Sequence, residues 1–212
     1  LKKTMTIIPQ KGKVVGGSTA VNAQIFLRGV SEDYDSWGMD GWSYDDLVPY
    51  FCKNETDPDF GDKYHGLEGP IRARRFRREE WLPEQKAFFD ACRAAEYPHC
   101  PDHNDPNSTG VGALPLNNPG GIRQSTALCY LDPARRRSNL TIQADSLVHR
   151  ILFEGQRAVG LRVEHDGKVS DIYGEKIVLC GGAIGSPHML LRSGVGPADH
   201  LREMGISVVL DL

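Results

Sequence analysis

A glycine pair near the start of the chain, Gly16-Gly17, is followed closely by Ser18, Thr19 and Asn22. Two adjacent glycines let the backbone come close to a bulky group, and the hydroxyls, backbone amides and carboxamide that follow are groups that bind anions. The same pattern is also typical of an ordinary turn followed by a helix cap. On these residues alone, an anion-binding segment and a plain turn both remain open.

Two other groups of polar residues could form a metal site or an RNA-binding site, but for each of them a role without such a ligand is favoured. His99, Cys100, Asp102 and His103 match no standard metal-ligand spacing and lie in a loop-like segment, so we predict no metal site. Residues 71–80 include five arginines, but two glutamates end the run, which favours a solvated face or a subunit contact over RNA binding.

No histidine is predicted to be catalytic. His188 lies just inside a predicted helix, where a surface or hydrogen-bonded histidine is more common than a proton shuttle. His65, His99 and His103 lie in loop-rich segments, and we expect none of them to have a fixed partner. We therefore assign no catalytic residue.

The composition is that of a globular chain and excludes several classes of partner. Of 212 residues 40% are hydrophobic, and 25 Lys+Arg against 28 Asp+Glu give a net charge of −3, so no positive field is available for nucleic acid or an anionic membrane. No apolar run is long enough to predict a transmembrane segment. Five cysteines without a CxxC pair favour a reducing compartment, and we expect a cytoplasmic location.

Caps and apolar spacing predict helices in the first half of the chain. Ser31 and Ser43 are each followed by acidic residues and begin two short helices, and residues 80–98 have the spacing of an amphipathic helix with Pro83 in its first turn. Residues 98–126 are predicted to be a long structured loop.

The second half of the chain predicts strands and then an alternation of strand and helix. After a strand candidate at 139–145, three further runs form a β-meander with a tight turn at Asp166-Gly167: 147–153, 158–165 and 168–173. The apolar run 175–182 is typical of a strand buried on both faces of a parallel sheet.

A helix is predicted to begin at Ser186 with Pro187 in its first position, and a shorter one follows over 196–205. The final strand is 206–212, and because the chain begins with Leu1 and ends in this apolar run, we expect a fragment.

Two long stretches together resemble the signatures of the glucose-methanol-choline (GMC) oxidoreductases. The first combines the glycine pair and its polar neighbours with further matching positions: Gly12, Lys13, Val15, Gly16, Gly17, Ser18, Thr19, Val21, Asn22, Phe26, Gly29 and Asp35. The second is 182–196, GAIGSPHMLLRSGVG, and the stretches 64–71 and 121–142 also resemble the family. Two distant motifs in the right order favour this family over a chance match.

The resemblance implies an α/β fold with α+β elements: an FAD-binding, Rossmann-like parallel sheet with a β-meander, plus part of a substrate-binding domain. Residues 1–56 would be an FAD-binding segment with the flavin attachment loop. Residues 57–138 would be a substrate-domain or lid segment, and 139–212 a second FAD-binding segment with the meander and the second signature.

By the same resemblance, Gly17 and Ser18 would contact the pyrophosphate of FAD, and Asn22 would hydrogen-bond the cofactor. Ala23 and Ile25 would lie against the flavin ring.

The backbone of Val148 would meet the adenine. Val21 stands where some relatives carry a histidine bonded covalently to the flavin, so noncovalent FAD is implied.

The implied function is that of an FAD-dependent oxidoreductase acting on CH–OH donors, with greatest likeness to choline-dehydrogenase-like members. It would oxidise a small-molecule alcohol to an aldehyde or ketone by hydride transfer to the flavin. Which alcohol it uses, and whether oxygen or another acceptor takes the electrons, stay open. Two alternatives are a redox-silent lyase on the same fold, like the hydroxynitrile lyases, and a noncatalytic interaction module.

The sequence also departs from the family. It contains no GxGxxG loop, which in the family places the diphosphate at a helix N-terminus, and the family's C-terminal catalytic histidine has no counterpart here. We therefore expect that the 212-residue chain alone oxidises no alcohol.

We predict that the 212-residue chain binds FAD weakly or not at all, because the helix-terminal amides of the GxGxxG loop are missing from it. Calorimetric titration of the purified chain with FAD measures this. A submicromolar dissociation constant would contradict the prediction.

Overall fold

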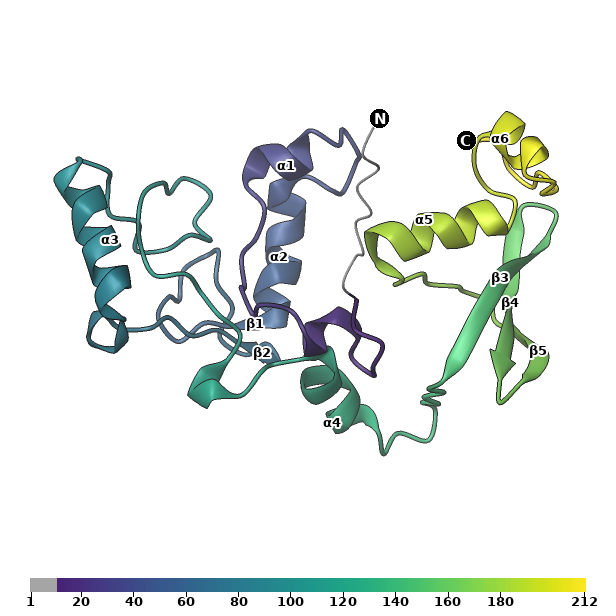
Figure 1. Cartoon of the computed structure of the whole chain (residues 1–212), viewed down its shortest axis with the longest axis horizontal. Helices are drawn as coiled ribbons and strands as arrows, with labels where there is room; N and C mark the ends of the chain where they lie inside the picture. The colour runs from purple at the N-terminus through teal and green to yellow at the C-terminus, as the bar shows by residue number, and fades with distance from the viewer. Residues whose placement is uncertain (1–10) are drawn as a thin grey trace, which may run out of the picture. The chain divides into compact units, whose positions relative to one another are not determined.

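The computed structural model describes residues 11–212, which divide into two compact units, unit 1 up to Leu140 and unit 2 over Thr141–Leu212 (Figure 1). No helix among these residues is long and apolar enough to cross a membrane.

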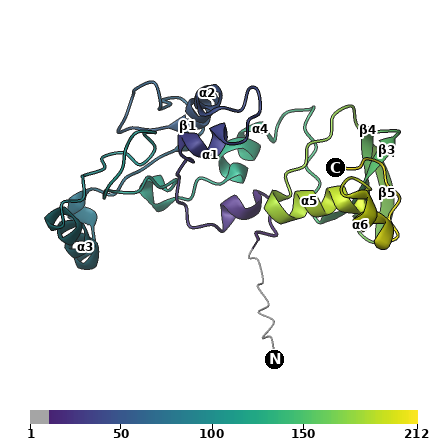
Figure 2. The same ribbon diagram turned by 90° about the horizontal axis from the view of Figure 1, so that it is seen from above.

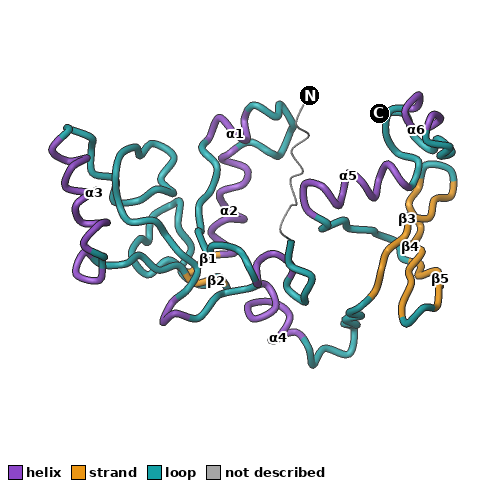
Figure 3. Tube along the Cα trace, viewed as in Figure 1, coloured by secondary structure: helices purple, strands orange, loops and turns teal. Residues whose placement is uncertain are grey.

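Unit 1 is built from short helices joined by long loops (Figure 3). Its α-helices and strands, in chain order, are α1 (Ser31–Asp35), α2 (Tyr44–Asn54), β1 (Glu55–Thr56), β2 (Ile71–Arg72), α3 (Pro83–Ala94) and α4 (Asp132–Ala134). Shorter helical turns are η1 (Gly17–Ala20), η2 (Arg78–Glu80), η3 (Pro119–Gly121) and the π-helical η4 (Ala127–Leu131). Figure 2 shows α3 at the end of unit 1 remote from α1 and α2.

The caps of α2 and α3 follow the sequence. Ser43 is the N-cap of α2, where its hydroxyl accepts a hydrogen bond from the amide of Asp46 at 3.2 Å and the Asp46 carboxylate accepts one from the amide of Ser43 at 3.1 Å. Pro83 begins α3 as its first residue, as predicted. Helix α1 begins one residue away from expectation, because Val30 is its N-cap and Ser31 its first residue.

Loop 98–126 crosses several segments of unit 1 and pairs with them by isolated bridges. Leu116 bridges both Ile25 and Arg74, and within the loop itself His99 bridges Val111. Strands β1 and β2 pair in parallel, with Glu55 opposite Ile71. These short pairings hold loops together where no extended sheet is present in unit 1 over residues 11–140.

Unit 2 contains the predicted meander. Strands β3 (Ser146–Glu154), β4 (Arg157–His165) and β5 (Lys168–Tyr173) form an antiparallel sheet in the order β3-β4-β5. Asp166 and Gly167 both have positive φ, 50° and 72°, as the predicted hairpin turn requires.

Two helices complete unit 2, α5 (Gly182–Arg192) and α6 (Ala198–Glu203). The hydroxyl of Ser193 ties the end of α5 to the sheet, since it accepts a hydrogen bond from the amide of Ile151 at 2.8 Å and donates one to the carbonyl of Met189 at 2.7 Å. The core is apolar and includes Ile151, Val163 and Leu201.

Three predicted strands of the second half are not strands. Residues 139–145 and the predicted strand 175–182 have no strand assignment, since 175–181 are irregular and Gly182 already belongs to α5. Within 206–212 only Leu210 bridges another residue, Val195. A strand exists only where a neighbour pairs with it, and no described segment pairs with 176–180. Val178 is 80% exposed, against the expectation of a strand buried on both faces.

Helix α5 begins four residues earlier than predicted, at Gly182 in place of Ser186. Ser186 lies within the helix, and its hydroxyl accepts a hydrogen bond from the backbone amide of Gly181, the N-cap residue, at 3.0 Å. Pro187 therefore lies inside the helix and not at its first position as predicted, and it has no amide to donate to the carbonyl of Ala183.

Candidate functional site

The two glycines of the pair have different structural roles. Gly16 (φ 95°) packs against Ala127, and a Cβ at this position would lie 3.0 Å from the Cβ of Ala127. Gly17 (φ 56°) has no atom within 4 Å of the position a Cβ would take. Gly16 is therefore needed for close packing, whereas the backbone at Gly17 is open to an approaching group.

A threonine clamp fixes the glycine-rich segment to the chain near η4. The amide of Thr126 donates to the hydroxyl of Thr19 at 3.0 Å, and the hydroxyl of Thr126 donates to the carbonyl of Gly16 at 3.1 Å. Sequence reasoning did not identify Thr126 individually, although it lies in the stretch 121–142 that resembles the GMC family.

Asn22 is held by one end of its side chain. Its Oδ1 accepts hydrogen bonds from Arg123 Nη1 at 2.8 Å and from the amide of Gln24 at 3.1 Å. The residue is exposed, so the Nδ2 end of the carboxamide can donate to a ligand. Ser18 is likewise exposed, and its hydroxyl accepts a hydrogen bond from the amide of Gly12 at 3.2 Å.

The apolar residues of the same segment lie open. Val21 is 58% exposed and Ile25 49% exposed, and Ala23 between them is also exposed. The structure thus brings five of the six predicted cofactor residues into one continuous stretch: Gly17, Ser18, Asn22, Ala23 and Ile25. The sixth, Val148, is half-buried in β3 of unit 2, opposite Val163 and beside a register shift of the strand.

This stretch fits a dinucleotide flavin in chemistry. The amide of Gly17 donates to the carbonyl of Val14 at 2.8 Å, and the free space beside Gly17 lets a ligand approach the backbone. The exposed hydroxyl and carboxamide suit phosphate oxygens, and the exposed apolar side chains suit a flat aromatic ring. Residues 11–25 include two lysines and no carboxylate, so no negative charge within the segment opposes a diphosphate.

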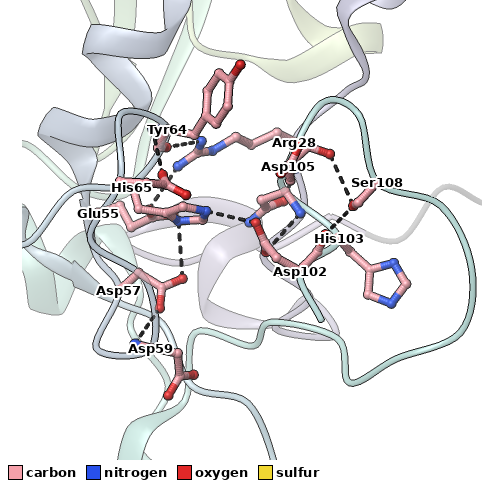
Figure 4. A network of polar contacts seen from close by, with 12 residues as sticks. Arg28, Glu55, Asp57, Asp59, Tyr64, His65, Asp102, His103, Asp105 and Ser108 are labelled. Atoms are coloured by element: carbon pink, nitrogen blue, oxygen red, sulfur yellow. Dashed lines mark hydrogen bonds and ion pairs between the residues drawn. The ribbon is translucent and has the colours of Figure 1, made fainter. Parts of the chain in front are cut away.

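A second polar group, the ion network, is buried in unit 1 and includes Arg28, three residues after Ile25 (Figure 4). It consists of three cations and three carboxylates, each with a side chain at most 8% exposed: Arg28, His65, Arg75, Glu55, Asp57 and Asp102. Balanced opposite charges allow these groups to be buried together.

His65 lies at the centre of the ion network. Its Nδ1 is 2.9 Å from Glu55 Oε1 and 3.3 Å from Asp57 Oδ2, and its Nε2 is 2.8 Å from Asp102 Oδ2. Burial opposes protonation, but the hydrogen bonds to Asp102, Asp57 and Glu55 outweigh it and raise the pKa of His65 to about 11. The ring is therefore an imidazolium that donates through both nitrogens.

The two arginines complete the ion network. Arg28 Nη2 lies 2.9 Å from Glu55 Oε1, while Arg75 bridges Asp57 at 2.8 Å and Asp102 at 2.7 Å. Burial would raise the pKa of Asp57, yet the hydrogen bonds from His65 and Arg75 lower it to about 2.

The ion network corrects two sequence expectations. His65 was expected to have no fixed partner, but all its polar atoms are hydrogen-bonded within the fold. Arg75 was assigned to a solvated or contact face with its neighbours, but it lies buried on partners from segments 18 and 27 residues away in sequence. Local sequence patterns do not report such long-range pairs.

Glu55, Asp57 and His65 also place potential metal-ligand atoms close together. His65 Nδ1 lies at hydrogen-bonding distance from Glu55 Oε1, 2.9 Å, and its Nε2 lies 2.8 Å from Asp102 Oδ2. With Arg28 and Arg75 neutralising the carboxylates, we interpret this cluster as an ion network rather than a metal centre.

Comparison with known proteins places this geometry in a family. The family model described as GMC oxidoreductase matches residues 2–210. The chain belongs to the GMC oxidoreductase family. The predicted resemblance is thereby confirmed.

The chain is similar to a human protein named as mitochondrial choline dehydrogenase, with 40% identity over 206 residues, covering 95% of this chain and 34% of that protein. Among solved structures it is similar to pyridoxine 4-oxidase from Mesorbium loti, with a TM-score of 0.88 and 34% identity, covering 95% of this chain and 40% of that one. An FAD-dependent oxidoreductase from Chaetomium thermophilum follows with a TM-score of 0.86 and 30% identity, covering 95% and 38%.

These structural matches confirm the expected fold class, that of GMC flavoprotein oxidoreductases. The chain spans 34–41% of the length of the first curated relatives that it matches. The assignment of 1–56, 57–138 and 139–212 to cofactor and substrate domains stays a prediction.

We predict that unit 1 loses stability as the pH rises above about 6.5. Below the ordinary pKa of 6.5 both folded and unfolded states hold the His65 proton, so its stabilising contribution is complete there and is lost as the pH approaches about 11. The contribution of Asp57 has the opposite sign, being present above its ordinary pKa of 3.8 and lost as the pH falls towards about 2.

Urea unfolding followed by tryptophan fluorescence reports on unit 1, since all 3 tryptophans lie in it. Between pH 7 and pH 9, the free energy of unfolding should fall by on the order of 1 kcal/mol per pH unit in the wild type and by much less in His65→Gln. His99→Gln, an exposed histidine of the same unit, serves as the control. Equal slopes for wild type and His65→Gln would contradict the assignment of a buried imidazolium.

Proposed function

We propose that this chain supplies flavin-binding and substrate-side segments of an FAD-dependent oxidoreductase that oxidises an alcohol to an aldehyde or ketone. The observation that carries the proposal is the stretch from Gly17 to Ile25, where open backbone, exposed donors and exposed apolar side chains follow one another. Family membership and the names of the similar oxidoreductases support it.

The chain's own residues would bind and orient the cofactor. The open backbone at Gly17 and the Ser18 hydroxyl would contact the pyrophosphate, and Asn22 Nδ2 would donate to the cofactor while Arg123 holds the other end of the carboxamide. Bound FAD would supply the hydride acceptor.

Ala23 and Ile25 would lie against the flavin ring, and the Val148 backbone would meet the adenine. Val21 offers no nucleophile or acid–base group, so we propose noncovalent FAD.

The residues of this chain are proposed to bind and position, and none of them to act as catalytic base. His65 cannot accept a proton, because both of its ring nitrogens already donate to carboxylates. The alcohol proton would then be removed by a residue that this chain does not supply.

The substrate proposed is a small-molecule alcohol, since one relative is named a choline dehydrogenase and one solved neighbour a pyridoxine 4-oxidase. A cytoplasmic location stays a prediction from the cysteines, all five of which are free thiols in the structure.

The decisive test is anaerobic bleaching of the flavin. We predict that the full-length protein carrying this chain purifies with FAD and that a panel of primary and secondary alcohols, choline included, bleaches its visible absorbance. Release of one aldehyde or ketone per flavin reduced would complete the stoichiometry. Retained flavin that no alcohol bleaches would contradict the proposal and favour the redox-silent lyase, and a protein without flavin would favour the interaction module.

Asn22 allows a finer test of the cofactor contact. In the full-length protein, Asn22→Ala should weaken FAD binding by about 1–2 kcal/mol, because the cofactor hydrogen bond is lost. Asn22→Asp keeps an oxygen for Arg123 and Gln24 but removes the Nδ2 donor, so it should weaken FAD binding as well.

Fluorescence titration of the deflavinated protein with FAD measures both variants against Asn139→Ala, an exposed asparagine outside the stretch. Wild-type affinity in Asn22→Asp would show that this side chain serves only the local structure.

A further inference from the structure

The first part of the segment 24–28, up to Phe26, is held by backbone groups of loop 98–126. The amide of Asn117 donates to the carbonyl of Gln24 at 2.9 Å, and the amide of Phe26 donates to the carbonyl of Pro115 at 2.9 Å. Up to Phe26 the segment therefore behaves as a short antiparallel strand.

Beyond Phe26 a side chain replaces the partner strand. Asn104 Nδ2 donates to the carbonyl of Phe26 at 3.1 Å, and Asn104 Oδ1 accepts from the amide of Arg28 at 3.0 Å. A carboxamide presents an N–H donor beside a carbonyl acceptor, as a neighbouring strand would present to residues 26 and 28. Asn104 is only 4% exposed, so water does not compete for these hydrogen bonds.

Asn104 is itself fixed by the ion network. Its backbone amide donates to Asp102 Oδ1 at 3.0 Å. The other oxygen of this carboxylate, Asp102 Oδ2, is 2.8 Å from His65 Nε2 (Figure 4). Arg28, whose amide Asn104 binds, reaches the same network through its guanidinium at Glu55. The segment is thus anchored to the ion network by its backbone and by a side chain.

The apolar groups of the segment remain free on its other side. Ile25 and Leu27 are 49% and 47% exposed, whereas Phe26 and Arg28 between and after them are more buried. This alternation is that of a strand with one face held by the protein and one face presented to a ligand.

We propose that Asn104 is a positioning residue that sets the height and tilt of the flavin-facing stretch Ala23–Ile25, and that Asp102 and His65 hold Asn104 in place for this purpose. The inference rests on the proposed function, because it needs a flavin over Ile25. Asn104 touches no reacting atom and acts only through the backbone of residues 26 and 28.

The test compares variants of the full-length, FAD-loaded protein. Asn104→Ala removes both hydrogen bonds to the segment, and FAD should dissociate about tenfold more readily, with a changed flavin fluorescence and a shifted reduction potential. Asn107→Ala, an exposed asparagine of the same loop, should leave all three readouts unchanged.

A second control separates positioning from stability. Ser43→Ala removes the N-cap of α2 in the same unit and should lower the melting temperature while the flavin fluorescence and potential stay as in the wild type. If Asn104→Ala does not fold, Asn104→Ser, a small uncharged variant that cannot bridge both backbone groups, is measured in its place.

The outcomes separate this inference from the proposed function. A wild-type protein that binds no flavin overturns both. A flavin-loaded protein in which the Asn104 variants lower the melting temperature but leave flavin affinity, fluorescence and potential unchanged overturns the positioning role alone.

Discussion

The charge balance around His65 is the constraint on which unit 1 depends. Desolvation of a buried ion costs several kcal/mol, and the attraction of an opposite charge in contact with the ion offsets this cost. Here three cations meet three carboxylates, and the removal of one partner leaves an uncompensated charge in the interior. The segments that carry these groups must therefore meet at one place, and this requirement fixes the path of the loops between them.

In unit 1 we interpret this ion network as holding the loops together, as the apolar core does in unit 2. The buried apolar side chains of unit 1 are few and include Tyr44 and Ala73, whereas unit 2 closes its meander over Ile151, Val163 and Leu201. Ion pairs are directional, so they determine which loops meet as well as how tightly. We interpret the network as the reason why a unit with so little regular structure holds a defined conformation in the stretch that we propose to face the cofactor.

The parts of the fold that sequence predicted are those set by local chemistry. Ser43 with Asp46, Pro83, and the Asp166-Gly167 turn each act within a few residues, and each lies where it was expected. The segment 176–180 failed for the opposite reason, because its hydrophobic run describes a strand only when a neighbouring strand pairs with it. Ser186 shows a smaller version of the same limit, since a cap pattern cannot reveal that the helix has already begun at Gly182.

The candidate site divides in the same way. The stretch from Gly17 to Ile25 is continuous in sequence, so the match to the GMC signature could point to it, whereas its residue types alone left a plain turn open. Its contacts with the cofactor stay a prediction. In the ion network, His65 bonds directly to Asp102, 37 positions away in sequence. No periodicity in the sequence predicts that two such residues are in contact. The sequence did contain one signal, a group of acidic residues, a histidine and arginines in polar loops. Burial of any one of these charged side chains alone has a high free-energy cost, so their burial would have implied that they pair with one another. The sequence could not show which of these charged groups pair. The fold shows that the guanidinium of Arg28 bonds to Glu55 in the ion network, while Arg28 itself follows closely on the stretch proposed to face the flavin.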